Sequence, residues 1–297
     1  MKKKFVPVLL CFALLFCLLP TPARADIGPK PSVSVALRGL SGERCYATLL
    51  SETPSTGPHS AIGTHPGNER LTEGDPSYAV FLKFAAYEDA DGYSFLQFFD
   101  DCTETQTFTW GYYPPARFKL LLYFPDQDCF AVSSAVYERY AFDSYFTTSL
   151  AGISLAPGTV QEGLTLQKSY DYKWESVSLV ARIAATVAVE LVIALLFGLR
   201  AKKQLLFLTW ANLATQVLLN VLLNIINYNQ GSFAFVFHYV WMELLVAAIE
   251  AVLYVRFLPQ KGEPMRAKWM LALYALVANA ASFCAGLWLA YIIPGIF

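Results

Sequence analysis

Ionisable side chains interrupt the apolar second half of this chain. Arg182, Glu190, Glu243 and Glu250 all stand within long runs of Leu, Val, Ala and Ile. Glu243 and Glu250 are seven residues apart, which places them on one face of a helix. A charged side chain at the centre of a bilayer costs at least about 2.5 kcal/mol, and such residues typically face the protein interior and mark ion or proton pathways. These residue types therefore indicate proton or cation binding.

Amide side chains form a second polar stripe in the segment before these glutamates. The stripe consists of Asn212, Gln216, Asn220 and Asn224, and its successive members are four residues apart. They therefore share one helical face. At 1.5 Å per residue, Gln216 lies at about the same depth as Glu243 when both are counted from the ends of their helices. Two interpretations stay open for this polar seam: contacts that hold helices together, or the lining of a transport path.

The apolar segments that carry this seam are long enough to cross a membrane. Residues 173–297 contain four of them, at 177–199, 205–226, 233–257 and 269–293. Each spans about 30 Å of hydrocarbon as a helix, so we predict a four-helix transmembrane bundle. In the last segment Ala278, Ser282 and Gly286 recur at intervals of four and predict close helix packing. Basic residues follow the first and third segments, which places both mature termini outside the cell membrane.

The composition agrees with a membrane location and excludes other classes. Of the 297 residues, 56% are hydrophobic and only 15% are charged, which is too apolar for an ordinary soluble domain. The formal net charge of -1 gives no basic face, so a nucleic-acid partner is not expected. The bilayer is therefore the first partner that the sequence predicts.

The first 25 residues have the order of a secretory signal peptide. Three lysines precede an apolar run, which is followed by Ala23-Arg24-Ala25, and cleavage is expected after Ala25. A membrane anchor is the alternative, but fifteen apolar residues fall short of the roughly 20 that a span needs. Residues 26–172 are therefore expected outside the cell.

Residues 26–172 show short apolar runs separated by turn signals. Strands are expected at 33–38, 44–50, 78–87, 93–99, 107–113, 117–124, 129–134 and 140–150. Strands at this frequency predict an antiparallel β-sandwich of one domain. The segment 54–75, which holds His59 and His65, is expected to form a long exposed loop.

Cysteines and acidic residues in this domain suggest two further features. Export permits disulfides, and an odd set of three cysteines allows at most one bridge, for which we expect Cys102 with Cys129. Free thiols packed as small apolar groups are the alternative.

Glu88, Asp89 and Asp91 imitate the start of a calcium loop, but they lack its regular spacing and its distal glutamate, so an acidic turn is the alternative.

No catalytic motif accompanies these features. The sequence lacks G-x-S-x-G, S-x-x-K, a P-loop, G-x-G-x-x-G, C-x-x-C and H-E-x-x-H. We therefore expect a protein that is not an enzyme and that needs no cofactor or resident metal.

Several stretches resemble a known group of proteins. They are ADIGPKPSVSV, YEDADGYSFLQ, WGYYPP, NVLLNIINYNQG and GLWLAYIIPGIF. They resemble a group of membrane proteins from Gram-positive anaerobic bacteria that have an exported domain and four helices. The resemblance implies a plasma-membrane protein. Since no activity is known for that group, it transfers no catalytic residue.

These patterns predict two possible functions. A third, an intramembrane enzyme, is ranked last because the sequence contains no set of catalytic residues. The first is an envelope protein whose exported β domain binds or senses an unknown extracellular ligand or protein while four helices anchor it. The second is a subunit of a proton- or cation-linked transporter or channel, with Arg182, Glu190 and Glu243 along the path. Four spans make a small conduit, so transport would need a homo-oligomer.

The charges of the seam do not balance, which leads to a prediction. Glu250 lies close to Arg256 along the helix and is expected to reach interfacial water, which leaves Glu190 and Glu243 to share Arg182. Since burial disfavours a charged carboxylate, we predict that at least one of these two glutamates is neutral near pH 7 or holds a cation. Infrared absorption of neutral carboxyl groups during a pH titration measures this. Two fully ionised glutamates at neutral pH would contradict it.

Overall fold

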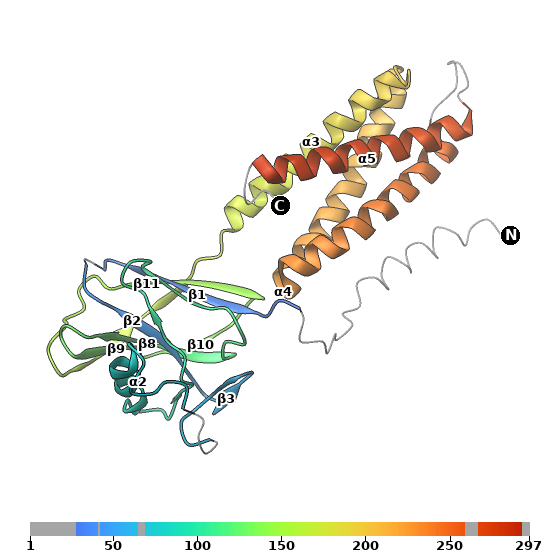
Figure 1. Ribbon diagram of the computed structural model, residues 1–297. Helices are drawn as coiled ribbons and strands as arrows, with labels where there is room; N and C mark the ends of the chain where they lie inside the picture. Colours follow the sequence, from blue (N-terminus) through green and yellow to red (C-terminus); the bar gives the residue numbers. More distant parts are fainter. Residues whose placement is uncertain (1–27, 41, 65–68, 259–266, 293–297) are drawn as a thin grey trace.

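The computed structural model describes residues 28–40, 42–64, 69–258 and 267–292. An N-terminal domain of mixed β-sheets lies at one end of the molecule, and long helices extend from it (Figure 1). The predicted signal peptide and most of the loop after the third predicted span lie outside the described residues.

Two β-sheets form the N-terminal domain. The first has the order β13-β11-β1-β7, with β1 Ser32–Arg38, β7 Thr107–Trp110, β11 Asp143–Ser149 and β13 Leu166–Lys168. The second has the order β12-β9-β8-β2-β5, with β2 Tyr46–Ser51, β5 Ser94–Phe95, β8 Arg117–Phe124, β9 Cys129–Ser133 and β12 Val160–Leu164. Beside this path, β6 (Asp100–Asp101) pairs with β2, and β10 (Tyr137–Glu138) pairs with β8. A small hairpin joins β3 (Ser55–Thr56) to β4 (His59–Ser60).

The two large sheets share one core. Val35 of β1, Leu49 of β2, Leu120 of β8 and Phe146 of β11 belong to a single buried cluster, as expected for sheets packed face to face. Helix α2 (Tyr78–Ala85) covers the other face of the second sheet. Strand β8 is therefore buried on both faces, which explains its apolar run from Leu120 to Phe124.

Two predictions about the strands of this domain were wrong. The sheets are mixed and not purely antiparallel, because β1 runs parallel to β11 and β12 runs parallel to β9. Residues 78–87, predicted as a strand, begin with α2 instead. Phe81 and Phe84 are buried three residues apart, a helical spacing, so packing against the sheet outweighs the strand preference of aromatic residues.

His59 is also placed differently from the prediction. It lies in the short hairpin and is only 5% exposed, with its ring 4.9 Å from that of Trp110 and 5.2 Å from that of Phe98. Arg70 Nη1 lies 2.7 Å from His59 Nδ1, a geometry in which a neutral imidazole accepts from the guanidinium. His65 lies outside the described residues. The segment 54–75 is therefore not simply an exposed loop.

The three cysteines of the domain are free and buried in the core, so the predicted Cys102–Cys129 disulfide is not formed. Strand order explains this. Cys129 begins β9, while Cys102 directly follows β6, three strand spacings away across β8 and β2. At about 4.8 Å per spacing this far exceeds the Cα separation of about 4.4–6.8 Å that a disulfide allows. The partner of Cys102 across the strands is Cys45, whose carbonyl accepts its amide hydrogen bond at 2.8 Å.

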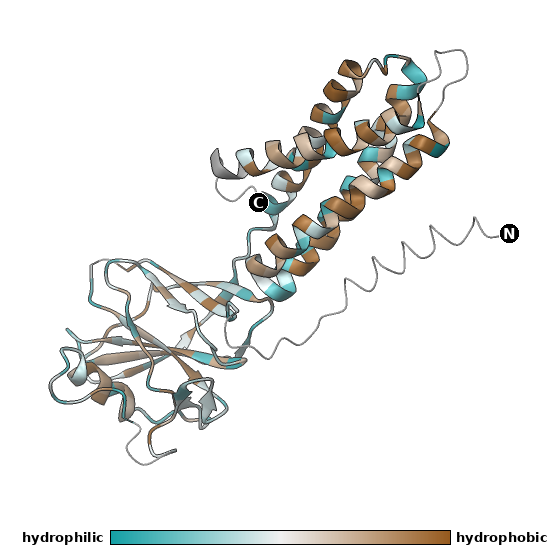
Figure 2. Cartoon of the chain, turned by 45° about the vertical axis from the view of Figure 1, so that its right-hand side comes forward, coloured by the Kyte–Doolittle hydropathy of each residue, from teal (hydrophilic) through white to brown (hydrophobic). Residues whose placement is uncertain are grey.

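Three helices of the second half are long and apolar enough to cross a membrane. They are α3 (Tyr172–Leu196), α4 (Lys202–Phe257) and α5 (Lys268–Ile292). Hydrophobic residues predominate along these helices (Figure 2), and many of their large apolar side chains are exposed, as lipid contact requires. Membrane-spanning helices are thus supported, and the four predicted spans are present in part as separate helices, because the second and third follow each other directly as the two arms of α4.

The second and third predicted spans form one kinked helix. The 56-residue α4 has a single non-helical residue, Gly231, with φ 83° and ψ 175°. Its two arms, 202–230 and 232–257, fold back side by side from this point (Figure 1). Hydrogen bonds between them, such as Tyr254 Oη to Asn212 Oδ1 at 2.6 Å, confirm the antiparallel arrangement. The predicted connecting loop is absent because a glycine can adopt a positive φ and reverse the chain within one residue.

The buried His59 gives the β domain a pH-dependent stability. Burial, and next the nearby Arg70 charge, lower the pKa of His59 from 6.5 to about 4. Between these two pKa values the unfolded chain binds a proton that the folded chain does not. The free energy of unfolding is therefore unaffected by His59 above about pH 6.5, and it falls by about 3 kcal/mol as the pH is lowered toward 4. Urea unfolding of the detergent-solubilised protein at both pH values measures this. His59→Phe should remove that part of the pH dependence, and an unchanged slope in this variant would refute the assignment.

Candidate functional site

The polar seam converges between α3, both arms of α4 and α5. Arg182 and Glu190 extend from α3, and Glu243 and Glu250 from the second arm of α4. The first arm supplies the buried amides of Asn212, Gln216 and Asn220, whereas Asn224 is half-buried. The four helical segments therefore surround the charged residues and separate them from the lipid-facing surface.

Glu250 is the best satisfied carboxylate of this seam. Thr215 Oγ1 donates to its Oε1 at 2.6 Å, and Asn279 Nδ2 donates to its Oε2 at 2.7 Å. Both oxygens thus accept a hydrogen bond, the arrangement that an ionised carboxylate needs. Glu250 is 0% exposed, so the prediction that it reaches interfacial water was wrong.

Glu190 is equally buried but has far fewer donors. Its Oε1 lies 3.5 Å from Ser282 Oγ, and its Oε2 has no hydrogen-bond partner among the described residues. Ser282 Oγ is closer to a carbonyl, that of Asn279, at 3.0 Å. Since a hydroxyl donates only one proton, Glu190 is poorly provided with donors for a full negative charge.

Arg182 interacts with side chains on both arms of α4. Its Nη2 donates to Asn224 Oδ1 at 3.1 Å. Its guanidinium carbon lies 5.9 Å from the centre of the Phe235 ring, within cation–π range. The positive charge is thus held between α3 and both arms of α4.

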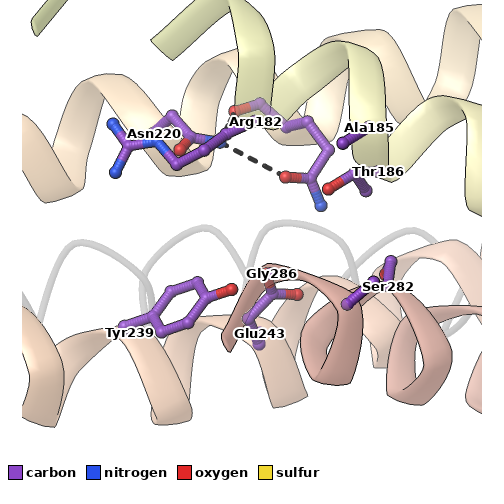
Figure 3. Close-up of a pocket in the computed structure, with 10 residues that line it drawn as sticks. Arg182, Ala185, Thr186, Asn220, Tyr239, Glu243, Ser282 and Gly286 are labelled. Carbon is purple, nitrogen blue, oxygen red and sulfur yellow. Dashed lines mark hydrogen bonds between the residues drawn. The ribbon is translucent and has the colours of Figure 1, made fainter. Parts of the chain in front are cut away.

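A cavity of about 20 Å³ lies at the centre of the seam. Arg182 and Thr186 reach toward it from one side, and Tyr239, Glu243 and Ser282 from the other (Figure 3). Gln216 also lines it. A cavity above about 10–15 Å³ can hold one water molecule, so this one has room for a water or an ion of similar size and for no larger substrate.

A second hollow lies on the β domain. It has a volume of about 340 Å³ and is lined by Ala61, Ala85, Tyr87, Asp89, Tyr93 and Phe95. This β-domain cleft combines aromatic rings with carboxylates and has the size of a small-ligand site, which typically spans about 300–1,000 Å³. It lies between the end of α2 and β5.

The carboxylates beside this cleft, which were only a weak calcium candidate, pair with a lysine. Lys119 Nζ lies 3.0 Å from both carboxylate oxygens of Asp89 and 2.5 Å from Asp91 Oδ2, and Lys119 is only 4% exposed. Burial disfavours its charge, but the hydrogen bonds with Asp91 and Asp89 outweigh this effect and raise the pKa of Lys119. The ammonium group therefore takes the position that a calcium ion would need, and Glu88 lies exposed at the rim.

The β domain is docked onto the turn of α4. The Phe142 amide donates to the Tyr228 carbonyl at 2.9 Å, and the Phe142 ring lies so close to Gly231 that a Cβ there would approach it to 2.5 Å. The ring of Tyr170, in the linker to α3, lies 5.7 Å from that of Tyr228 and 6.5 Å from that of Tyr140. These contacts connect both domains without relying on the linker alone.

Several of these residues were not identified as functional from the sequence. Ser282 was expected only to pack, and Asn279 was not singled out at all. Asn279 interrupts an apolar run four residues from Ala275 and three from Ser282, so polarity within the last segment was the available signal. Phe142 carries no such signal, because its role depends on where α4 turns.

Comparisons with known proteins do not assign a family. No family model matches this chain, and no curated protein or solved structure matches it either. The resemblance to membrane proteins of Gram-positive anaerobes therefore stays a prediction, and function has to be inferred from the geometry.

The junction at Gly231 generates a stability prediction. At φ 83° and ψ 175° the backbone of Gly231 lies in a region that essentially only glycine adopts, so Gly231→Ala should cost about 1–3 kcal/mol, and more for the contact with Phe142. Gly152 has φ +85° with nothing within 4 Å of a Cβ, so Gly152→Ala is a matched control that has only the backbone cost. Thermal unfolding in detergent compares the two variants. Adding Phe142→Ala should recover part of the Gly231→Ala loss, and equal losses in both alanine variants would contradict the proposed contact.

Proposed function

We propose that this chain is a multipass plasma-membrane protein whose β domain, on the outer face, binds an extracellular ligand or protein partner. The helical domain anchors it through four passes: α3, the two arms of α4, and α5. The β-domain cleft carries this proposal. Its volume of about 340 Å³, its aromatic rings and its polar groups are those of a small-ligand site.

The docking of the β domain supports a sensing role beyond simple anchoring. The hydrogen bond from Phe142 to Tyr228 and the contact at Gly231 join the domain to the point where both arms of α4 meet. A shift of the loop before β11 would act directly on the geometry of the arms. Packed elements respond to such shifts as units, because protein interiors have few voids.

Proton- or cation-linked transport is the second candidate. The observation that favours it is the burial of Arg182, Glu190, Glu243 and Glu250 in the helical domain, where Arg182 and Glu243 line one cavity. Helix association alone can be achieved with neutral residues, whereas buried ionisable groups in membranes usually serve a function. The cavity of about 20 Å³ is too small for a solute, so transport by one chain would be limited to protons or a small ion.

Reciprocal variants distinguish the two functions. Ala85→Trp places an indole in the β-domain cleft, and Ala86→Trp is its matched control because Ala86 is exposed and does not line the cleft. The full-length protein in lipid nanodiscs is screened against peptide and glycan arrays. For a binding protein, Ala85→Trp should reduce array binding at least about tenfold, since filling a cleft excludes its ligand. Ala86→Trp and Glu243→Gln should bind normally.

Flux measurements in vesicles test the second function, for which the effects of the two variants are reversed. If transport is the function, Glu243→Gln abolishes a pH-gradient-driven flux, and Ala85→Trp leaves that flux intact. If the wild-type protein binds nothing on the arrays and the flux depends on Glu243, the second proposal replaces the first.

A further inference from the structure

The cavity in the helical domain is bordered by a donor and an acceptor that lack partners. Gln216 Nε2 and Glu243 Oε2 are both buried and make no hydrogen bond among the described residues. Both residues line the cavity of about 20 Å³. Leaving such groups unsatisfied is costly, whereas one water molecule in a polar cavity of this size can accept from Gln216 Nε2 and donate to Glu243 Oε2. Geometry and hydrogen-bonding capacity therefore agree on a water site.

Ser282 connects this water site to the second carboxyl group. Its side chain lines the cavity opposite Arg182 and Thr186 (Figure 3). Its Oγ also lies 3.5 Å from Oε1 of Glu190, whose other carboxyl oxygen has no hydrogen-bond partner among the described residues. The hydroxyl donates to the Asn279 carbonyl at 3.0 Å, which leaves its lone pair free to accept from a neutral Glu190. Ser282 therefore stands between the cavity and Glu190.

We propose that a water molecule bound by Gln216 and Glu243 in this cavity, together with the hydroxyl of Ser282, forms a proton-exchange path between Glu243 and Glu190. This role goes beyond anchoring, and it does not depend on what the β-domain cleft binds. The path begins at Glu243 and ends at the fully buried Glu190.

Each transfer along the path conserves protons. The Glu243 carboxyl group gives its proton to the water, and the water gives one of its own protons to Ser282 Oγ. Ser282 turns from the Asn279 carbonyl and gives its hydroxyl proton to the Glu190 carboxylate. The water and the hydroxyl each gain and lose one proton, so the net change is one proton moved between two carboxyl groups.

The charged and titratable side chains around the path set its energetics. They are Arg182 and Glu190 on α3, Tyr239, Glu243, Glu250 and Tyr254 on α4, and Tyr274 on α5. Glu250 already accepts hydrogen bonds from Thr215 and Asn279, which makes it the glutamate best able to stay ionised. One proton is then exchanged between the remaining two glutamates.

Infrared spectroscopy of the full-length protein in phosphatidylcholine vesicles tests the path. Neutral carboxyl bands are assigned by their loss in Glu190→Gln and Glu243→Gln, and the probe is transfer from H₂O to D₂O. In the wild-type protein the Glu243 band should shift first and the Glu190 band later, because exchange reaches Glu190 through Ser282. The proposal would be overturned if neither glutamine variant lost a neutral carboxyl band, or if the Glu190 band shifted before the Glu243 band.

Variants of the two bridging groups separate a relay from a packing role. Ser282→Ala should slow exchange at Glu190 at least tenfold and leave exchange at Glu243 unchanged, and Ser282→Thr, which keeps the hydroxyl, should restore it. Gln216→Met removes a partner of the water without touching Ser282 and should also slow exchange at Glu190. Thr209→Val is a control, since Thr209 only donates to the Leu205 carbonyl. Unchanged Glu190 exchange in either Ser282→Ala or Gln216→Met would refute the path.

Discussion

The hydrogen bonds that Thr215 and Asn279 donate to Glu250 tie the helical domain together. They join the first arm of α4 and helix α5 to a carboxylate on the second arm. Lipid offers no donors that could replace them, so the helices have to stay where these donors reach Glu250. Tyr254 and Asn212 repeat the link between the arms close by. The positions of α3 and of the cavity follow from this arrangement, because both are packed against the same helices.

The same constraint connects the membrane seam to the β domain. The arms of α4 are held together by their polar contacts, and they meet at Gly231, where Phe142 of the β domain is packed. The loop that carries Phe142 is therefore in direct contact with helices whose register is fixed by buried hydrogen bonds.

Much of the architecture could be predicted from residue patterns. Strand β8 and the membrane-spanning character of the last 125 residues follow from apolar runs whose lengths suit a buried strand or a bilayer. Helix α2 could not be predicted in the same way, because its aromatic residues favour strands until a sheet offers them a surface. The pairing of cysteines failed for a similar reason: sequence spacing does not give the order of strands across a sheet.

By itself the sequence determined that acids and amides would be carried on helices in lipid, and that they would have to turn toward protein. The hydrocarbon core of a bilayer does not solvate charged groups, so this conclusion needs only the composition and the helical period. Which groups meet was decided by the tertiary structure. The sharp reversal at Gly231 sets the depth of one arm against the other, and the crossing of α5 brings Asn279 to Glu250 and Ser282 to Glu190. These distances depend on how separate helices pack, which no local pattern along one helix encodes.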